Sequence, residues 1–327
     1  GPDAMTQCAI LKPSCVFYGI CLALTLLAPA CVADEKTAVA TIKSMDGQAS
    51  VDSKTGKVIQ VSLASRRVRG DDLEDLAPLT SLRMLDISGT DIRDEGLRFV
   101  VSLKSLAALD LSDARVTGPG LRHLTRLPQL EIVGLGGIQV TDSTLQHVAS
   151  LTQIKRLDLS RSRVTDRGLA SLAELENLEQ LVLVGTRVSD NGIEHLASLK
   201  NLDSLNVSGT RITDAALNGV SGESALTTLI ADNTDITSQG VASLKGNKEL
   251  KVLCLGLTRI DDKAMPHLGT LTGLETLALS GTAITDADLL QLGTLTTLQT
   301  LTLNSTRVTK EGVEKLQKAL PDCTIHW

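Results

Sequence analysis

Aliphatic residues return along this chain at a fixed interval of 24 residues. Ten consecutive units follow the pattern without insertion or deletion, and an eleventh, degenerate unit precedes them over residues 55–78. The fourth position of the regular units is always Leu or Ile, and the fourteenth is always Val or Ile. The regular units begin at Leu79, Leu103, Leu127, Leu151, Leu175, Leu199, Glu223, Asn247, Leu271 and Leu295. A repeat this short predicts a solenoid of stacked layers.

The order of hydrophobic and polar positions inside one unit predicts two short elements. The seventh and ninth positions are aliphatic and their neighbours are mostly polar, which is typical of a strand with one buried face. Two further aliphatic columns, at the nineteenth and twenty-second positions, follow a Thr-Asp pair and predict one face of a short helix. Each unit is therefore strand, turn, helix and turn, and only stacking can bury these faces.

The segment Val-Thr-Asp-x-Gly-Leu recurs at the turn into each predicted helix, as in residues 164–169. We expect Val or Ile to pack the turn, Thr to supply an N-cap oxygen, and Asp to lie at the positive end of the helix. Gly allows close approach of neighbouring units, and Leu returns to the core. The Thr residues expected to cap are Thr117, Thr141, Thr165, Thr213 and Thr285.

Written as a consensus, the unit is LxxLxxLDLSxTxVTDxGLxxLxx, which resembles a leucine-rich repeat. It is similar to the Thr-Asp-x-Gly-Leu variety of bacterial envelope proteins, and is related to the repeats of F-box adaptors and ribonuclease inhibitor. The resemblance covers residues 55–320. It implies an α/β leucine-rich repeat solenoid, or horseshoe, with parallel strands on the concave face and short helices on the convex face. It implies no particular chemistry, because the family shares a scaffold.

The Asn or Cys that usually follows the strand in this family is Thr in seven units of this chain. The resemblance then implies a column of buried hydroxyls that bond to loop backbone. Ala114 and Ile138 interrupt the column, so their units must satisfy these backbone groups in another way. The seven residues are Thr90, Thr186, Thr210, Thr234, Thr258, Thr282 and Thr306.

The start of the chain is typical of a secretory leader. Lys12 precedes an apolar run, and no residue from Pro13 to Ala33 is charged. An uncleaved membrane anchor over residues 13–33 and a lipid-modified Cys31 are the alternatives. We predict an expression scar plus signal peptide or anchor over residues 1–33, an N-terminal cap over 34–54, the leucine-rich repeat domain over 55–318 and a C-terminal cap strand over 319–327. The expected location is the periplasm, cell envelope or extracellular space.

Composition narrows the possible functions. Aromatic residues make up 1% of the chain, so the core must be built from small aliphatic layers. A net charge of -6 argues against nucleic acid as a partner. Only Cys254 and Cys323 lie outside the leader, which gives no disulfide framework and no zinc spacing. No catalytic or phosphate-binding motif is present, so we expect neither enzyme activity nor a cofactor.

The sixth, eighth and tenth positions of each unit are expected to point outward from the concave face. This surface has small, mostly polar side chains and no aromatic residue, although protein hot spots favour Trp, Tyr and Arg. The more varied middle of the surface is the candidate ligand-binding patch. It comprises Arg156, Asp158, Gln180, Val182, Ser204, Asn206, Thr228 and Ile230.

Arginine is frequent at the thirteenth position, where it occupies seven of eleven units. Arg163, Arg187 and Arg211 are expected to form a row on one rim, which is suited to a sulfated or acidic glycan or an acidic protein. The alternative, which we favour, is a structural ladder of ion pairs between this column and the Asp residues of the sixteenth position. Those residues are Asp142, Asp166, Asp190 and Asp214.

Four histidines share the twenty-first position, namely His123, His147, His195 and His267. His123 and His147 lie in adjacent units, but no carboxylate or Cys column joins them, so we expect solvated side chains and no metal site. The sequence thus predicts an exported recognition scaffold that binds a protein or polysaccharide. A structural, self-associating envelope component and, by analogy alone, an enzyme inhibitor or adaptor are the alternatives. The membrane would be contacted only through an uncleaved leader.

Overall fold

The computed structural model describes residues 33–219, 226–245 and 247–327. The predicted signal peptide and Glu223 therefore lie outside the described residues, except for Ala33 at the end of the leader. Contacts divide the described chain into two compact units, which we call the N-terminal unit, up to Leu178, and the C-terminal unit, from Glu179. None of the helices in the described ranges combines the length and apolarity that crossing a membrane requires.

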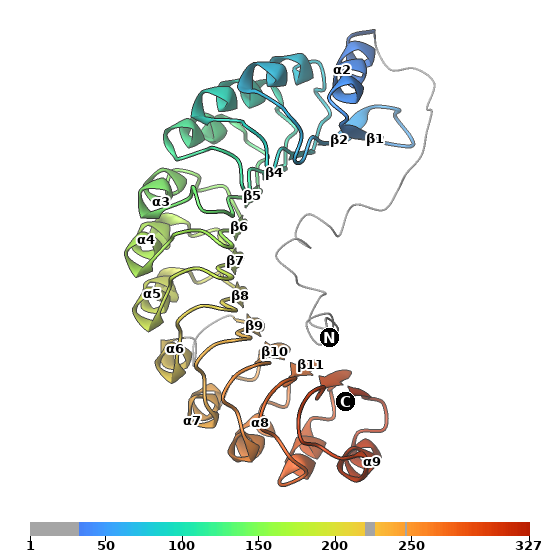
Figure 1. Cartoon of the computed structure of the whole chain (residues 1–327), viewed down its shortest axis with the longest axis vertical. Helices are drawn as coiled ribbons and strands as arrows, with labels where there is room; N and C mark the ends of the chain where they lie inside the picture. Colours follow the sequence, from blue (N-terminus) through green and yellow to red (C-terminus); the bar gives the residue numbers. More distant parts are fainter. Residues whose placement is uncertain (1–32, 220–225, 246) are drawn as a thin grey trace. The chain divides into compact units, whose positions relative to one another are not determined.

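The N-terminal unit begins with a helix and an antiparallel strand pair and continues as parallel layers (Figure 1). Its strands are β1 (Gln48–Val51), β2 (Val58–Ser62), β3 (Met84–Asp86), β4 (Ala108–Asp110), β5 (Ile132–Gly134) and β6 (Arg156–Asp158). Its helices are α2 (Ala33–Ser44), η2 (Gly70–Leu76), η3 (Asp94–Ser102), η4 (Pro119–Arg126), α3 (Asp142–Val148), α4 (Asp166–Leu169) and η5 (Ala170–Glu174). From β2 onward each strand is parallel to the next, with residues 24 apart in register.

The C-terminal unit repeats the same arrangement and ends with a longer helix and a last parallel strand. Its strands are β7 (Gln180–Val182), β8 (Ser204–Asn206), β9 (Thr228–Ile230), β10 (Val252–Cys254), β11 (Thr276–Ala278), β12 (Thr300–Thr302) and β13 (Thr324–His326). Its helices are α5 (Asp190–Glu194), η6 (His195–Ser198), α6 (Asp214–Gly219), α7 (Ser238–Val241), η7 (Ala242–Leu244), η8 (Asp262–Ala264), α8 (Met265–Leu268), η9 (Leu289–Thr294) and α9 (Lys310–Ala319).

The aliphatic columns form the core between the strands and the helices of each unit. Within the first regular repeat, Leu82, Leu85 and Ile87 are completely buried, and so are Ile92 and Leu97. Strands lie on one side of this core and helices on the other (Figure 1). We call the sheet surface that faces away from the helices the strand face. The predicted α/β solenoid of parallel strands and short helices is confirmed in both units.

The Thr285 hydroxyl accepts the Ala287 N–H at 3.0 Å, as expected for an N-cap. Most of these turns are also stabilised by the Asp of the preceding repeat, a contact that the sequence did not indicate. Thr165 donates from its backbone N–H and its hydroxyl to the two carboxylate oxygens of Asp142, at 2.8 and 2.7 Å. Thr213 donates to Asp190 in the same way, at 2.7 Å for both bonds. The Asp of one repeat therefore binds the corner of the next, and we call this contact the corner clamp.

The glycine of the same motif fits the corner clamp. A Cβ on Gly168 would collide with a carboxylate oxygen of Asp142, and a Cβ on Gly240 would collide with one of Asp214. The prediction that Gly allows close approach of neighbouring units is therefore confirmed. "Thr-Asp-x-Gly-Leu" recurs because a repeat with this motif supplies one half of a clamp to each neighbour.

The hydroxyl column that follows the strands is satisfied within each repeat. The Thr90 hydroxyl donates to the Ile87 carbonyl at 2.6 Å, and that of Thr186 donates to the Leu183 carbonyl at 2.8 Å. Ser162 occupies the same position, but its buried hydroxyl has no hydrogen-bond partner in the described structure. The column is therefore interrupted at Ala114 and Ile138, and Ser162 adds an unsatisfied hydroxyl in the last repeat of the N-terminal unit.

Candidate functional site

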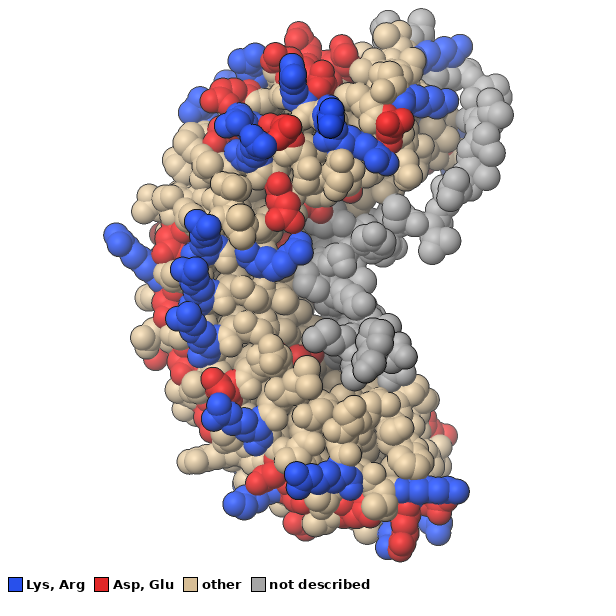
Figure 2. All heavy atoms as spheres, viewed as in Figure 1, with Lys and Arg blue, Asp and Glu red and all other residues tan. Residues whose placement is uncertain are grey.

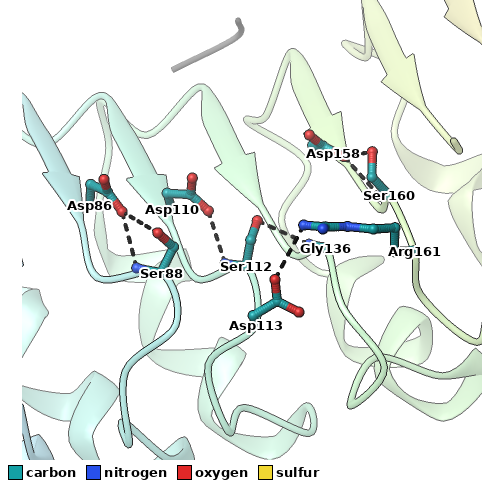
Figure 3. A network of polar contacts seen from close by, with 9 residues as sticks. All are labelled: Asp86, Ser88, Asp110, Ser112, Asp113, Gly136, Asp158, Ser160 and Arg161. Carbon is teal, nitrogen blue, oxygen red and sulfur yellow. Dashed lines mark hydrogen bonds and ion pairs between the residues drawn. The ribbon is translucent and has the colours of Figure 1, made fainter. Parts of the chain in front are cut away.

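A row of carboxylates lies on the strand face of the N-terminal unit, at the eighth position of its repeats (Figure 3). Each carboxylate accepts hydrogen bonds from the serine two residues later. The Ser88 N–H and hydroxyl donate to Asp86 at 3.0 and 2.7 Å, and the Ser112 N–H donates to Asp110 at 2.9 Å. These bonds close the turn after the strand, so the carboxylates have a structural role.

Burial perturbs two of these carboxyl groups. Removal from water, together with the neighbouring charges of Asp86 and Asp158, raises the pKa of Asp110 to about 6, against hydrogen bonds from Ser112 that lower it. The pKa of Asp158 is also raised by burial, while hydrogen bonds from Ser160 and the charge of Arg161 oppose that shift. Asp110 therefore loses its charge in mildly acidic solution.

A glycine-rich repeat separates Asp110 from Asp158. In the strand register Gly134 lies between the two, so no side chain stands between their strand positions. Two residues further, the Gly136 N–H donates to the Ser112 hydroxyl at 3.2 Å. Arg161 then reaches across this repeat to Asp113, at 3.2 Å (Figure 3). Both side chains of that ion pair are exposed, so its contribution to stability is small.

The strand face of the C-terminal unit has a different character. Its eighth-position residues are Val182, Asn206, Ile230, Cys254, Ala278 and Thr302. Ile230, Cys254 and Ala278 form one buried apolar cluster, with Val252 packed against it. The Asp232 carboxylate lies at the end of β9, accepts the Gly256 N–H at 2.6 Å, and has its pKa raised to about 6 by burial.

The residues of the predicted binding patch divide between the two units. Arg156 and Asp158 belong to the N-terminal unit, and Gln180, Val182, Ser204, Asn206, Thr228 and Ile230 to the C-terminal unit. Asp158 and Asn206 are both buried acceptors for turn serines, and Ile230 belongs to the apolar cluster. The repeated Asp-x-Ser and Asn-x-Ser sequences were the signal for this structural role. The patch as a ligand site stays a prediction.

The favoured ladder between Arg and the sixteenth-position Asp is wrong, because the corner clamps occupy Asp142, Asp190 and Asp214. Within the described ranges, none of Asp142, Asp190 and Asp214 forms an ion pair with a thirteenth-position Arg.

The thirteenth-position arginines that do form ion pairs use acidic residues of their own column. Arg115 pairs with Asp91 at 2.9 Å and Arg259 with Asp235 at 2.7 Å. The arginines of the predicted rim row lie in different units, with Arg163 in the N-terminal unit and Arg187 and Arg211 in the C-terminal unit. All three are exposed, and their role as a grip for an acidic ligand stays a prediction.

The histidine column contributes no metal site within the described ranges, where no three His, Cys, Asp or Glu side chains gather in a suitable cluster. The pKa of His123 is lowered by burial and by the nearby charges of Arg122, Arg126 and Arg98. This imidazole is therefore mostly neutral at pH 7.

Comparison with known proteins agrees with the repeat geometry. A family model for the leucine-rich repeat matches residues 79–101, 151–173 and 294–316. The structure of an internalin (inlF) from Listeria monocytogenes is similar, with 19% identity, a TM-score of 0.53, and coverage of 92% of this chain and 98% of that chain. A TDR receptor structure has 18% identity, a TM-score of 0.51, and coverage of 83% and 47% respectively. No curated protein sequence matches the chain.

Together, the registered parallel strands, the short helix in each layer and the matched repeats show that the fold is a leucine-rich repeat solenoid. Solenoids of this class present extended surfaces on which partners bind.

Proposed function

We propose that the protein is an exported, non-enzymatic recognition scaffold that binds a partner protein on its strand face. The observation that carries this proposal is the eighth-position row. Its flanking columns, at positions seven and nine, are aliphatic and buried in almost every repeat, whereas the eighth position changes from Asp to Gly, Val, Asn, Ile, Cys, Ala and Thr. The fold uses the constant columns and accepts many different side chains at the eighth position, which supports a role for this column in recognition.

A comparison inside the chain supports this separation of roles. Asn206 accepts the N–H and hydroxyl of Ser208 at 3.1 and 2.9 Å, as Asp86 accepts those of Ser88. The turn therefore needs an acceptor but no charge. The carboxylates of the N-terminal unit carry more charge than folding requires, which favours a contact with a polar or basic region of a partner.

A non-enzymatic role agrees with the chemistry of the strand face. The carboxylates at the eighth position are already engaged by the serines of their own turns, and general acid or base catalysis needs a group that is free to reach a substrate proton. Export is proposed from the leader pattern alone. Polysaccharide binding and self-association are the competing functions.

Affinity capture from an envelope extract tests the proposal. The bait is the full chain beside two strand-face variants, Asp86→Asn with Asp110→Asn, and Arg156→Glu with Val182→Glu. Glu174→Gln, on the exposed helix side, is the matched control. We expect one partner protein to bind the wild type and the control, and to bind at least one strand-face variant more than tenfold more weakly, which is a loss of about 1.4 kcal/mol.

Two results would contradict the proposal. Retention of the same partner by both strand-face variants would move the binding surface elsewhere. Capture of the chain itself as the sole product would favour a structural, self-associating component.

A further inference from the structure

The first two corners of the N-terminal unit differ from all later ones. The fifteenth position is Thr, Ser or Asp in the later repeats, but it is Arg69 and Arg93 in the first two. Gly70 stands at the sixteenth position of the first repeat, so Arg93 has no Asp carboxylate opposite its backbone. The corner clamp is therefore absent at this place in the described structure, and two long cationic side chains replace it.

A cavity of about 370 Å³ lies at these corners. Gly70 and Gly96 form part of its wall, and their backbones are so close that a Cβ on either would lie 2.7 Å from the Cα of the other. The charged side chains around it are Arg69, Asp71, Asp91, Arg93, Glu95 and Arg115. This volume is within the range of small-molecule sites.

Local ion pairs neutralise part of this charge. Arg115 is held by Asp91 at 2.9 Å, and Asp71 lies 3.5 Å from Arg98, which is outside the cavity. Arg69 and Arg93 are exposed and form no ion pair within the described part of the chain. Figure 2 shows this mixture of basic and acidic side chains over the N-terminal repeats.

We propose that this cavity binds a small acidic sugar, either free or as one residue of a polysaccharide. The guanidinium groups of Arg69 and Arg93 would hold its carboxylate or sulfate, because a guanidinium presents paired N–H donors that match two oxygens of such a group. Glu95 would accept hydrogen bonds from sugar hydroxyls. The Glu95 carboxylate repels a ligand that carries several negative charges. The site therefore selects a ligand with one anionic group and otherwise neutral polar groups.

Isothermal titration calorimetry with the full chain tests the site. The probes are glucuronate, inorganic sulfate and a polyuronate. We expect the double variant Arg69→Gln with Arg93→Gln to weaken sugar binding by at least about tenfold, since it removes charge-assisted hydrogen bonds. Arg93→Lys keeps the positive charge but loses the paired N–H donors of the guanidinium. It should weaken sugar binding by a smaller factor than the double variant does.

The matched control is Arg187→Gln with Arg211→Gln, which removes the same charge from exposed arginines of the C-terminal unit. Binding of glucuronate that depends on Arg69 and Arg93 would support a site for a free sugar acid. Binding of the polyuronate alone, with the same dependence, would support a subsite for one residue of a chain.

The proposal is overturned if neither sugar binds, if inorganic sulfate binds as tightly as glucuronate, or if the control weakens binding as much as the double variant. Unchanged thermal unfolding of the variants would show that they fold. Because this cavity lies away from the strand face, its failure would leave the proposed protein-binding role intact.

Discussion

The strand faces of the two units offer the same backbone geometry with opposite chemistry. In the N-terminal unit the eighth positions from β3 to β6 read Asp86, Asp110, Gly134 and Asp158, while in the C-terminal unit Ile230, Cys254 and Ala278 form an apolar cluster. The strands are in the same 24-residue parallel register in both units. The parallel register therefore forms with either an acidic or an apolar side chain at the eighth position, provided that the neighbouring positions match it.

The largest expected effect on stability comes from placing an acidic side chain in the apolar cluster of the C-terminal unit. Ile230→Asp places a carboxylate inside the buried apolar cluster, where it has no compensating charge, and should destabilise the C-terminal unit by about 3 kcal/mol or more. Urea unfolding followed by circular dichroism measures this. Ile230→Val is the control and should cost about 1 kcal/mol. Equal midpoints for the Asp and Val variants would mean that the cluster is not a desolvated environment.

The corner clamps should respond alike in both units, because their geometry is the same. Asp142→Ala leaves the Thr165 N–H and hydroxyl without their acceptor, and Asp190→Ala does so for Thr213. Each change should destabilise its unit by about 2 kcal/mol in urea unfolding. Asp→Asn at either position retains one acceptor oxygen and should cost less. A loss in one unit but not in the other would contradict a common clamp.

The charge at the eighth position should make stability depend on pH. The pKa of Asp110 is about 6 in the folded protein, above the value of about 3.9 in an unfolded chain. The folded state therefore binds more protons in this window, and its stability falls as pH rises from about 4 to 6. Asp110→Asn should stabilise the protein by roughly 1–2 kcal/mol at pH 7.5 and by almost nothing at pH 4.

The reciprocal change provides the control for that experiment. Asn206→Asp introduces a charge at a buried eighth position of the C-terminal unit, and should destabilise the protein at pH 7.5 but not at pH 4. Thermal unfolding at the two pH values compares both variants with the wild type. A stabilisation by Asp110→Asn that persists unchanged at pH 4 would show that the buried charge is not its cause.

The smallest expected effect concerns the hydroxyl column. Ser162→Ala removes a buried hydroxyl that has no partner, and should change stability by less than about 0.5 kcal/mol in either direction. Thr186→Ala removes a hydroxyl that donates to the Leu183 carbonyl at 2.8 Å, together with a methyl group, and should cost about 1–2 kcal/mol. Similar losses for the two variants would mean that Ser162 has a partner in solution.

The fold was predictable because the columns of the repeat report burial directly. Leu85 and Ile87 are aliphatic at a spacing of two, and Leu97 and Val100 at a spacing of three, which specifies a strand and a helix before any contact is known. Contacts between repeats were not predictable in the same way. Asp142 is followed at once by its own helix, and nothing local indicates that its partner is Thr165, 23 residues later.

The candidate sites were less predictable still, because polar residues serve both folding and binding. Asp158 was chosen for its outward position, yet it closes a turn by accepting the Ser160 N–H at 2.8 Å. The recurring columns do not predict the arginine cavity, because Arg69 and Arg93 are departures from the Thr column. Exceptions to a repeat are the more informative positions once the repeat itself is known.

The corner clamp also has a consequence for how such a chain can change its length. A repeat of the consensus type carries an Asp for its successor and a Thr for its predecessor, so a duplicated block of 24 such residues arrives with both halves of a clamp. Unequal recombination in whole repeats would keep each junction satisfied, while a break inside a repeat would leave unmatched halves on both sides. Growth and shortening by complete modules is thus built into the hydrogen bonding of the corners.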